Sequence, residues 1–278
     1  MNVAGKTGGN MQLDSFQGEP HEFRWLKTFY NACPQKVQKL IYLYYEKSLH
    51  NRLLSIFLRD VAIERLRKAS TKCKSIDDYI ALAFSFKLGP FDIKPAQIEW
   101  EISRLMQILA KLKPKAALEI GTERGGTFFL LTKVASQDAT LMSVDLPRGP
   151  LGGWYSKRKI PFYRSFGSAN QKIHLLRMDS HNETTLSEVE RILCSRKLDF
   201  LFIDGDHSYE GVKKDFQMYG KLVKRGGIVA FHDIAVHPLE TGCEVNRFWN
   251  EIKELYEYIE IIKNLNQTWA GLGVIFKR

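Results

Sequence analysis

The sequence predicts an α/β protein with one doubly wound, mostly parallel sheet and a helical extension before it. From about residue 95 to residue 278, short apolar runs alternate with helical stretches, and polar, mainly acidic residues follow the apolar runs. Before residue 95 the apolar residues recur at helical spacing instead. Repeated β-α units of this kind are typical of a sheet with helices on both faces. We therefore expect two regions, residues 1–94 and 95–278.

The first region is expected to be helical after a loosely ordered start. Its first 20 or so residues are rich in Gly, Asn and Gln, which favours little fixed structure. From about Pro34 to Lys68, basic residues stand between regularly spaced apolar ones, which predicts one or two amphipathic helices. Basic amphipathic helices can bind membranes, but more often they bury their apolar face in their own domain, and we favour burial. Ser75 is the expected N-cap of the next helix.

The second region supplies the sheet. Residues 95–114 are expected to form a helix with an apolar face, ended by Pro114. The expected strands are AALEI, TLMSVD, KIHLLRMD, DFLFID, GGIVAFHD, YIEIIKN and GLGVIFK. The expected helices between them begin at about Gly126 and then comprise TTLSEVERILCSR, EGVKKDFQMYGKLV and NRFWNEIKELYEY. Sheets of this kind bind ligands outside the carboxyl ends of their strands, so the residues that follow the apolar runs should converge there.

Composition limits the classes of function. The chain has 278 residues, 44% of them hydrophobic, which is enough for one large α/β domain with a helical partner. Its net charge of +10 permits an anionic partner, but the basic residues are dispersed and no nucleic-acid-binding motif is present, so nucleic acid is the minor alternative. The N-terminus has no apolar signal segment, and no stretch approaches the roughly 20 apolar residues of a membrane span.

The cysteines indicate the compartment. Cys33, Cys73, Cys194 and Cys243 are scattered, with no C-x-x-C pair. This spacing argues against a disulfide framework and against a structural zinc site, and it favours a reducing compartment. We expect a cytoplasmic protein.

The residues at the strand ends predict a ligand site. Five consecutive expected strands end in an acid, which ordinary turn chemistry does not readily explain; the residues are Glu119, Asp145, Asp179, Asp204 with Asp206 and His207, and His232 with Asp233. The loop LEIGTERGGT opens a helix, whose free N–H groups attract an anion such as a carboxylate. Glu119 would repel a pyrophosphate but could accept from an ammonium group. Asp145 could bind ribose hydroxyls, and Asp179 could accept from an adenine amine. S-adenosylmethionine, an amino acid joined to an adenosine, satisfies all three.

The motifs LEIGTERGGT, SVDLP, RMDSH, FLFIDGDHSYEGVKKDF and GGIVAFHDI, in this order and spacing, resemble class I S-adenosylmethionine-dependent methyltransferases. Within that class the likeness is to the branch of cephalosporin-hydroxylase-like proteins and macrolide or sugar O-methyltransferases, over roughly residues 95–278. The resemblance implies a seven-stranded Rossmann-like sheet whose last strand is antiparallel. The candidate cofactor-binding residues are Glu119, Gly121, Thr122, Gly125, Gly126, Thr127, Asp145, Asp179, Ser180 and Asp204.

The resemblance also implies a metal and a base. Metal-dependent members hold magnesium at positions that match Asp204, His232 and Asp233, but they have an acid where this chain has His232. Magnesium prefers oxygen ligands, whereas an imidazole suits manganese, iron or zinc better, so Mg²⁺ or Mn²⁺ assistance and an ion-free pocket both stay open. His207 and Asp206 match positions proposed as general base in relatives, and a neutral imidazole titrates in the useful range.

Two loops are candidates for acceptor binding. The segment PRGPLGGWYSKRKIPFYRSFGSANQ is too long for a tight connection. Its aromatic residues could cover a substrate and its basic residues could hold an acidic group; these are Trp154, Tyr155 and Phe162, and Lys157, Arg158 and Arg164. A solvated basic loop is nearly as good an interpretation. The loop from Ile234 to Cys243 is a second candidate rim, while Tyr209 and Lys213 are expected to be ordinary helix residues.

The expected function is S-adenosylmethionine-dependent methylation of a hydroxyl of a sugar or other small natural product. A nicotinamide-dependent dehydrogenase is one alternative, although the fingerprint G-x-G-x-x-G is missing. A non-catalytic S-adenosylmethionine-binding or interaction module is another. The expected partner is a small-molecule acceptor, and the amphipathic helices would also permit a homo-oligomer.

Overall fold

A seven-stranded sheet organises the computed structural model, which describes residues 52–88, 91–147 and 155–278. The strand order is β5-β4-β3-β6-β7-β9-β8. All neighbouring pairs from β5 to β7 are parallel, whereas β9 is antiparallel to both β7 and β8. The strands are β3 (Ala116–Ile120), β4 (Thr140–Asp145), β5 (Lys172–Arg177), β6 (Leu198–Ile203), β7 (Val223–His232), β8 (Glu257–Ile261) and β9 (Leu272–Phe276). The expected seven-stranded sheet with an antiparallel last strand is confirmed.

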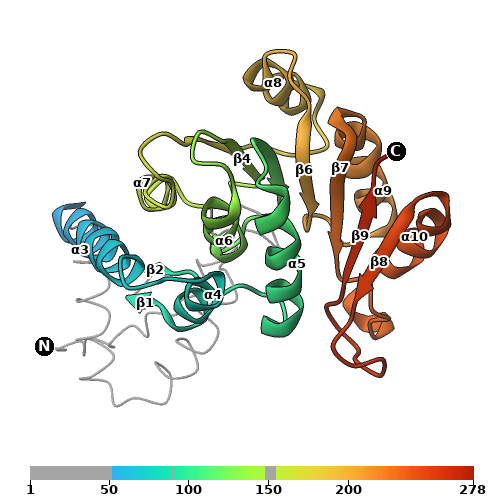
Figure 1. The fold of residues 1–278 in the computed structure, drawn as a ribbon, viewed down its shortest axis with the longest axis horizontal. Coiled ribbons are helices and arrows are strands. Elements are labelled where there is room, and N and C mark those ends of the chain that lie inside the picture. Colours follow the sequence, from blue (N-terminus) through green and yellow to red (C-terminus); the bar gives the residue numbers. More distant parts are fainter. Residues whose placement is uncertain (1–51, 89–90, 148–154) are drawn as a thin grey trace, which may run out of the picture. The chain divides into compact units, whose positions relative to one another are not determined.

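Helices cover both faces of this sheet (Figure 1). One hydrophobic core joins the sheet to α3 (Arg52–Ser70), α4 (Ile76–Ser85), α5 (Glu99–Leu112), α6 (Gly126–Val134) and α7 (Ile160–Arg164). The opposite core joins it to α8 (Glu183–Leu193), α9 (Tyr209–Tyr219) and α10 (Val245–Ile252). Short 3₁₀ turns follow at η1 (Gly220–Leu222), η2 (Leu239–Thr241) and η3 (Lys253–Leu255). The doubly wound architecture is therefore the one that the alternating pattern predicts.

The strands β3, β4 and β6 are almost completely buried because helices cover both of their faces. Alternate side chains of β6 illustrate this: Phe200 and Phe202 enter one core, while Leu201 and Ile203 enter the other. The chain runs from β3 outward to β4 and β5, and then returns to β6 on the other side of β3. In sheets of this kind ligands bind where the strand order reverses, which here is at the carboxyl ends of β3 and β6.

The helices before residue 95 share the core of the sheet. Ala62 and Leu66 of α3 and Ile80 of α4 are buried in the same hydrophobic cluster as α5 and α6. Ser75 caps α4 as expected: its hydroxyl accepts from the Asp78 N–H, and the Asp78 carboxylate accepts from the Ser75 N–H. A two-residue ribbon, β1 (Lys87–Leu88) with β2 (Phe91–Asp92), follows.

The expectations for the start of the chain, including the loosely ordered first residues and any helix before Arg52, lie outside the described residues. Among the helices of the described ranges, none has the length and apolar content to cross a bilayer. Cys73, Cys194 and Cys243 are free thiols.

Candidate active site

The loop between β3 and α6 brings the backbone of β3 against that of β6. Gly121 has φ of +82°, and a Cβ on it would collide with the backbone carbonyl of Asp204. Only glycine fits this close approach. Gly125 also has a left-handed backbone, and it is followed by the helix start expected at Gly126. Gly126 itself packs against the backbone of residues 93–95, so the structure gives it a packing role.

Glu119 lies beside this loop, inside β3, and is only 1% exposed. Neither carboxyl oxygen has a hydrogen-bond partner among the described residues. Burial raises the pKa of Glu119 well above its ordinary value; the nearby Thr122 hydroxyl opposes the rise, and the negative charges of Asp204 and Asp145 add to it. A buried carboxyl without a donor is costly, so this position requires either a proton or a cationic ligand.

Asp145, the last residue of β4, fixes the loop from the neighbouring strand. Its Oδ2 accepts from the backbone N–H groups of Thr122, at 2.9 Å, and Glu123, at 2.8 Å. The Thr122 hydroxyl lies 2.5 Å from that of Ser143. Burial raises the pKa of Asp145, while the two backbone donors oppose the rise. The carboxylate is thus held in one orientation at the lip of the crevice.

Asp179 and Ser180 form the turn after β5, next to β4 in the sheet. Asp179 is exposed, and its Oδ1 accepts from the His181 N–H at 2.9 Å. The backbone carbonyl of Ser180 accepts from the Tyr219 hydroxyl at 2.7 Å. The structure therefore gives both residues a local role in the turn. Because β5, β4, β3, β6 and β7 are consecutive in the sheet, the predicted strand-end acids lie along one edge.

The ends of β6 and β7 carry a cluster of acids and imidazoles. The His232 Nδ1 lies 3.1 Å from Asp204 Oδ1 and 3.1 Å from Asp233 Oδ2. His207, in the turn after β6, places Nε2 3.5 Å from Asp204 Oδ1 and Nδ1 3.4 Å from Asp233 Oδ2. The two histidines thus both lie between the same two carboxylates. Four of the five predicted metal or base residues are thus brought together, and Asp206 is not among them.

Electrostatics couple the members of this cluster. Burial disfavours the charged form of His232, but Asp204 and Asp233 outweigh it and raise its pKa well above the ordinary value. The pKa of His207 is raised as well, because the two carboxylates outweigh its burial. Burial opposes the ionised forms of Asp204 and Asp233, yet the imidazoles lower the pKa of both. The carboxylates and imidazoles of this cluster thus stabilise one another's charged forms.

Several contacts of the site are not indicated by any motif in the sequence. Gln97, just before α5, donates from Nε2 to Asp204 Oδ2 at 2.6 Å and accepts from the Thr127 hydroxyl at 2.7 Å. Asp233 Oδ1 accepts from the Ala270 N–H and lies 3.1 Å from His237 Nε2. Gln97 is separated from Asp204 by 107 residues, so no local pattern could reveal it. His237 belongs to the predicted rim loop, but its contact with Asp233 was not expected.

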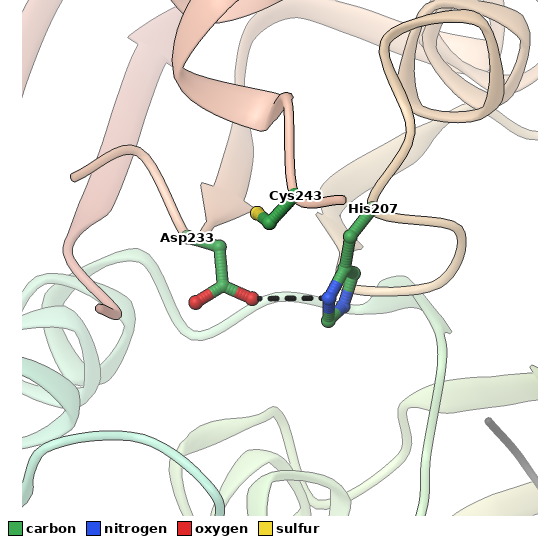
Figure 2. A group of neighbouring side chains, drawn as sticks. All are labelled: His207, Asp233 and Cys243. Carbon is green, nitrogen blue, oxygen red and sulfur yellow. Dashed lines mark ion pairs between the residues drawn. The ribbon is translucent and has the colours of Figure 1, made fainter. Parts of the chain in front are cut away.

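One further side chain, that of Cys243, lies beside the same cluster. Figure 2 shows His207, Asp233 and Cys243 pointing toward one another, from the turn after β6, the end of β7 and the segment before α10. Burial raises the pKa of the Cys243 thiol to about 11. In the sequence, Cys243 is distinguished only as the last residue of the predicted rim loop.

Asp206 faces a different neighbourhood from His207. It is exposed, its Oδ1 accepts from the Ser208 N–H at 2.9 Å, and a Cβ on Gly211 would collide with its carboxyl group. The structure therefore places Asp206 in the turn that begins α9. Tyr209 and Lys213 are helix residues, as expected: the Lys213 Nζ donates to the Tyr209 hydroxyl at 2.9 Å.

The predicted aromatic cover needs correction. Tyr155 and Phe162 are fully buried in the hydrophobic core, and the Tyr155 hydroxyl bonds to that of Ser143 at 2.7 Å. Their rings pack among Tyr163 and Phe166, so they support the sheet and do not cover a substrate. Among the basic residues of the loop, Lys157, Arg158 and Arg164 are exposed. Trp154 lies outside the described residues.

The chain is similar to several known proteins. Residues 118–234 match the Methyltransf_24 family, described as a methyltransferase domain. The chain is 27% identical over 176 residues to uncharacterized protein y4gI of Sinorhizobium fredii, covering 62% of this chain and 18% of that protein. It is 29% identical over 116 residues to uncharacterized protein R132 of Acanthamoeba polyphaga mimivirus, covering 42% and 50%. The chain thus spans half or less of the length of these curated relatives.

A solved structure shares this fold. Cofactor-bound Rv0187 from MTB superposes with a TM-score of 0.52 at 15% identity, covering 74% of this chain and 99% of that one. The O-methyltransferase TomG from Streptomyces achromogenes, solved with SAM, has a TM-score of 0.48 at 15% identity, covering 74% and 91%. The matched segment contains Glu119, Asp145, Asp204 and Asp233. The chain therefore shares the fold of cofactor-bound Rv0187, and its residues 118–234 are similar to the methyltransferase domain that the Methyltransf_24 family model describes.

Proposed function

We propose that this protein transfers a methyl group from S-adenosylmethionine to a hydroxyl of a sugar or other small natural product. The observation that carries the proposal is the buried Glu119 carboxyl, which has no hydrogen-bond donor among the described residues and adjoins the Gly121 loop. The ammonium group of the cofactor's methionine part would supply the missing cationic donor. A dinucleotide pyrophosphate, in contrast, would meet an uncompensated acid at this position.

Further residues would hold the rest of the cofactor. Asp145, oriented by its two backbone donors, would accept from the ribose hydroxyls. The adenine would lie toward Asp179 and Ser180, and the N-terminal turn of α6, from Gly125 to Thr127, would face the carboxylate. Thr122 and Asp204 complete the proposed set. When bound, the cofactor supplies an electrophilic methyl group on a sulfonium sulfur.

The proposed general base is His207. Its side chain is 40% exposed, whereas that of His232 is 4% exposed, so an acceptor hydroxyl can reach the former. Asp204 and Asp233 lie on the two nitrogen sides of the ring and would stabilise the imidazolium that forms when His207 takes the hydroxyl proton. Asp206, the other predicted base, orients the turn through Ser208 and would act by fixing the position of His207.

A divalent cation is a further part of the proposal. One ligand atom each from Asp204, His232 and Asp233 lies within 4.8 Å of the others, which fits a shared ion. Mixed oxygen and nitrogen ligands suit Mn²⁺ better than Mg²⁺. A bound cation would lower the pKa of the acceptor hydroxyl. Gln97, which donates to the second oxygen of Asp204, would keep the first oxygen turned toward this position.

The partner, the oligomeric state and the location of the protein are also proposals. The partner is a small-molecule acceptor, with a homo-oligomer compatible with the exposed apolar residues such as Leu239 and Leu265. The free thiols of Cys73, Cys194 and Cys243 agree with a cytoplasmic location.

The test is transfer of label from methyl-labelled S-adenosylmethionine to a panel of sugars and hydroxylated natural products, with release of S-adenosylhomocysteine as a second readout. We expect label in an oxygen-linked methyl group, and a stimulation by Mn²⁺ that is lost in Asp204→Asn. Binding of S-adenosylhomocysteine without any transfer across the panel would favour a non-catalytic module instead.

A further inference from the structure

A second set of metal-ligating atoms overlaps the cluster described above. His207, Asp233 and Cys243 each offer one ligand atom, and these atoms lie within 4.8 Å of one another. The closest measured pair, His207 Nδ1 and Asp233 Oδ2, is 3.4 Å apart (Figure 2). The set shares only Asp233 with the Asp204–His232–Asp233 group, and it replaces a second carboxylate with a thiol.

Backbone contacts hold the three contributing segments in place. The Glu244 N–H donates to the carbonyl of His207 at 2.8 Å, which ties the segment of Cys243 directly to the turn of His207. Asp233 Oδ1 is engaged by the Ala270 N–H and faces His237, which turns Oδ2 toward His207. These contacts fix the three segments without using the ligand atoms, and Asp233 Oδ2 lies 3.1 Å from His232 Nδ1 as well.

The chemistry of the set selects the ion. Zinc binds cysteine sulfur at about 2.3 Å, and histidine nitrogen and carboxylate oxygen at about 2.0–2.2 Å, in tetrahedral geometry. Such bonds separate two ligand atoms by roughly 3.3–3.8 Å, and the 3.4 Å between His207 Nδ1 and Asp233 Oδ2 lies in this range. Magnesium does not favour a thiolate. The half-exposed ring of His207 leaves an entry for the ion from solvent.

We propose that His207, Asp233 and Cys243 form a binding site for a thiophilic divalent cation, Zn²⁺, with a fourth position open to water or an acceptor. The site differs from the oxygen-rich set in its ligands and in its preferred ion. Binding occupies the Nδ1 lone pair of His207, so Zn²⁺ would inhibit proton transfer to that ring, whereas Mn²⁺ at the other set would not. This inhibitory consequence, unlike the metal site itself, rests on the proposed function.

The test uses Co²⁺ as a spectroscopic substitute for Zn²⁺ in the full chain. We expect a thiolate-to-cobalt charge-transfer absorption that Zn²⁺ abolishes by displacement. Cys243→Ser should remove this absorption and weaken Co²⁺ binding by at least roughly 100-fold, since even outer-shell changes cost 10- to 100-fold. Cys194→Ser, which alters an exposed thiol, is the matched control and should leave both unchanged.

A second measurement does not depend on a variant that folds. Alkylation of the native chain, followed by mass spectrometry, should show Cys243 protected by Zn²⁺ and Cys194 not protected. Binding of Co²⁺ without the thiolate absorption, or equal alkylation of Cys243 with and without Zn²⁺, would overturn the proposed site. Calorimetry with S-adenosylhomocysteine on the same samples tests the proposed cofactor site. Neither the cobalt absorption nor the alkylation requires turnover, so a failure of the metal site and a failure of the proposed function can be told apart.

Discussion

Glu119→Gln removes the buried charge on which the proposed cofactor site depends. A hydrogen bond to a charged group contributes about 1.5–3 kcal/mol, so the affinity for S-adenosylhomocysteine should fall roughly 10- to 150-fold. The variant keeps the size of the side chain, and Glu119 has no hydrogen-bond partner among the described residues that the change would break. The fold without ligand should therefore be at least as stable as that of the native protein.

The raised pKa of Glu119 also predicts how stability and cofactor affinity change with pH. Burial raises the pKa of Glu119 above 4.5, so the folded protein without ligand holds the proton more tightly than the unfolded chain does. The free energy of unfolding should consequently fall as pH rises from 4.5 toward the raised pKa. An ammonium ligand prefers the carboxylate, so affinity should rise over the same pH range. Both the fall in stability and the rise in affinity with pH should be smaller in Glu119→Gln, in which Asp145 still titrates.

The assay is calorimetric titration with S-adenosylhomocysteine at several pH values, with urea unfolding in parallel. Glu188→Gln is the matched control, because it makes the same charge change on the surface of α8, where Glu188 pairs with Arg191. Unchanged affinity in Glu119→Gln would refute the reasoning. So would a loss of stability as large as the loss of binding free energy, since Glu119 would then be a structural residue.

Three further predictions concern the loop, the base and a buried lysine. Gly121→Ala should lower the free energy of unfolding by about 2–5 kcal/mol, because the new Cβ collides with the Asp204 backbone and the backbone is strained. Gly226 has a similar φ but nothing within 4 Å of a new Cβ, so Gly226→Ala should lower the free energy of unfolding less in the same urea titration. His207→Gln should reduce turnover roughly 10²- to 10⁴-fold while S-adenosylhomocysteine affinity is retained, and full turnover would remove it as the base. Burial lowers the pKa of Lys133 from 10.5 to about 8, so the free energy of unfolding should rise by up to about 3 kcal/mol between these pH values. In Lys133→Met the free energy of unfolding should rise less over this pH range. The same rise in the variant as in the native protein would contradict the assignment to Lys133.

The fold could be predicted because its signals are local. The apolar run ending in Ile203 and the glycine loop around Gly121 each carry their own periodicity or backbone requirement. The strand-end acids could also be located, because parallel strands bring their carboxyl ends to one edge. The hydrogen bonds of these acids could not be predicted from the strand pattern. Asp145 accepts from the glycine loop, whereas Asp179 and Asp206 accept from backbone N–H groups of their own turns.

The rest of the site depends on contacts between distant segments. Gln97 reaches Asp204 only because α5 begins at the edge of the crevice. Cys243 meets His207 through a loop whose path the sequence does not encode as a regular pattern. Tyr155 was wrongly expected to cover a substrate, because an aromatic residue in a glycine-rich loop has the same sequence signature whether it faces a ligand or the core.

Calorimetric titration of the native chain with S-adenosylhomocysteine, with NADH as the control ligand, tests the central claim most directly. We expect saturable binding of S-adenosylhomocysteine at one site per chain and no binding of NADH. Binding of NADH alone, or of neither ligand, would contradict the assignment of the Glu119 crevice to S-adenosylmethionine.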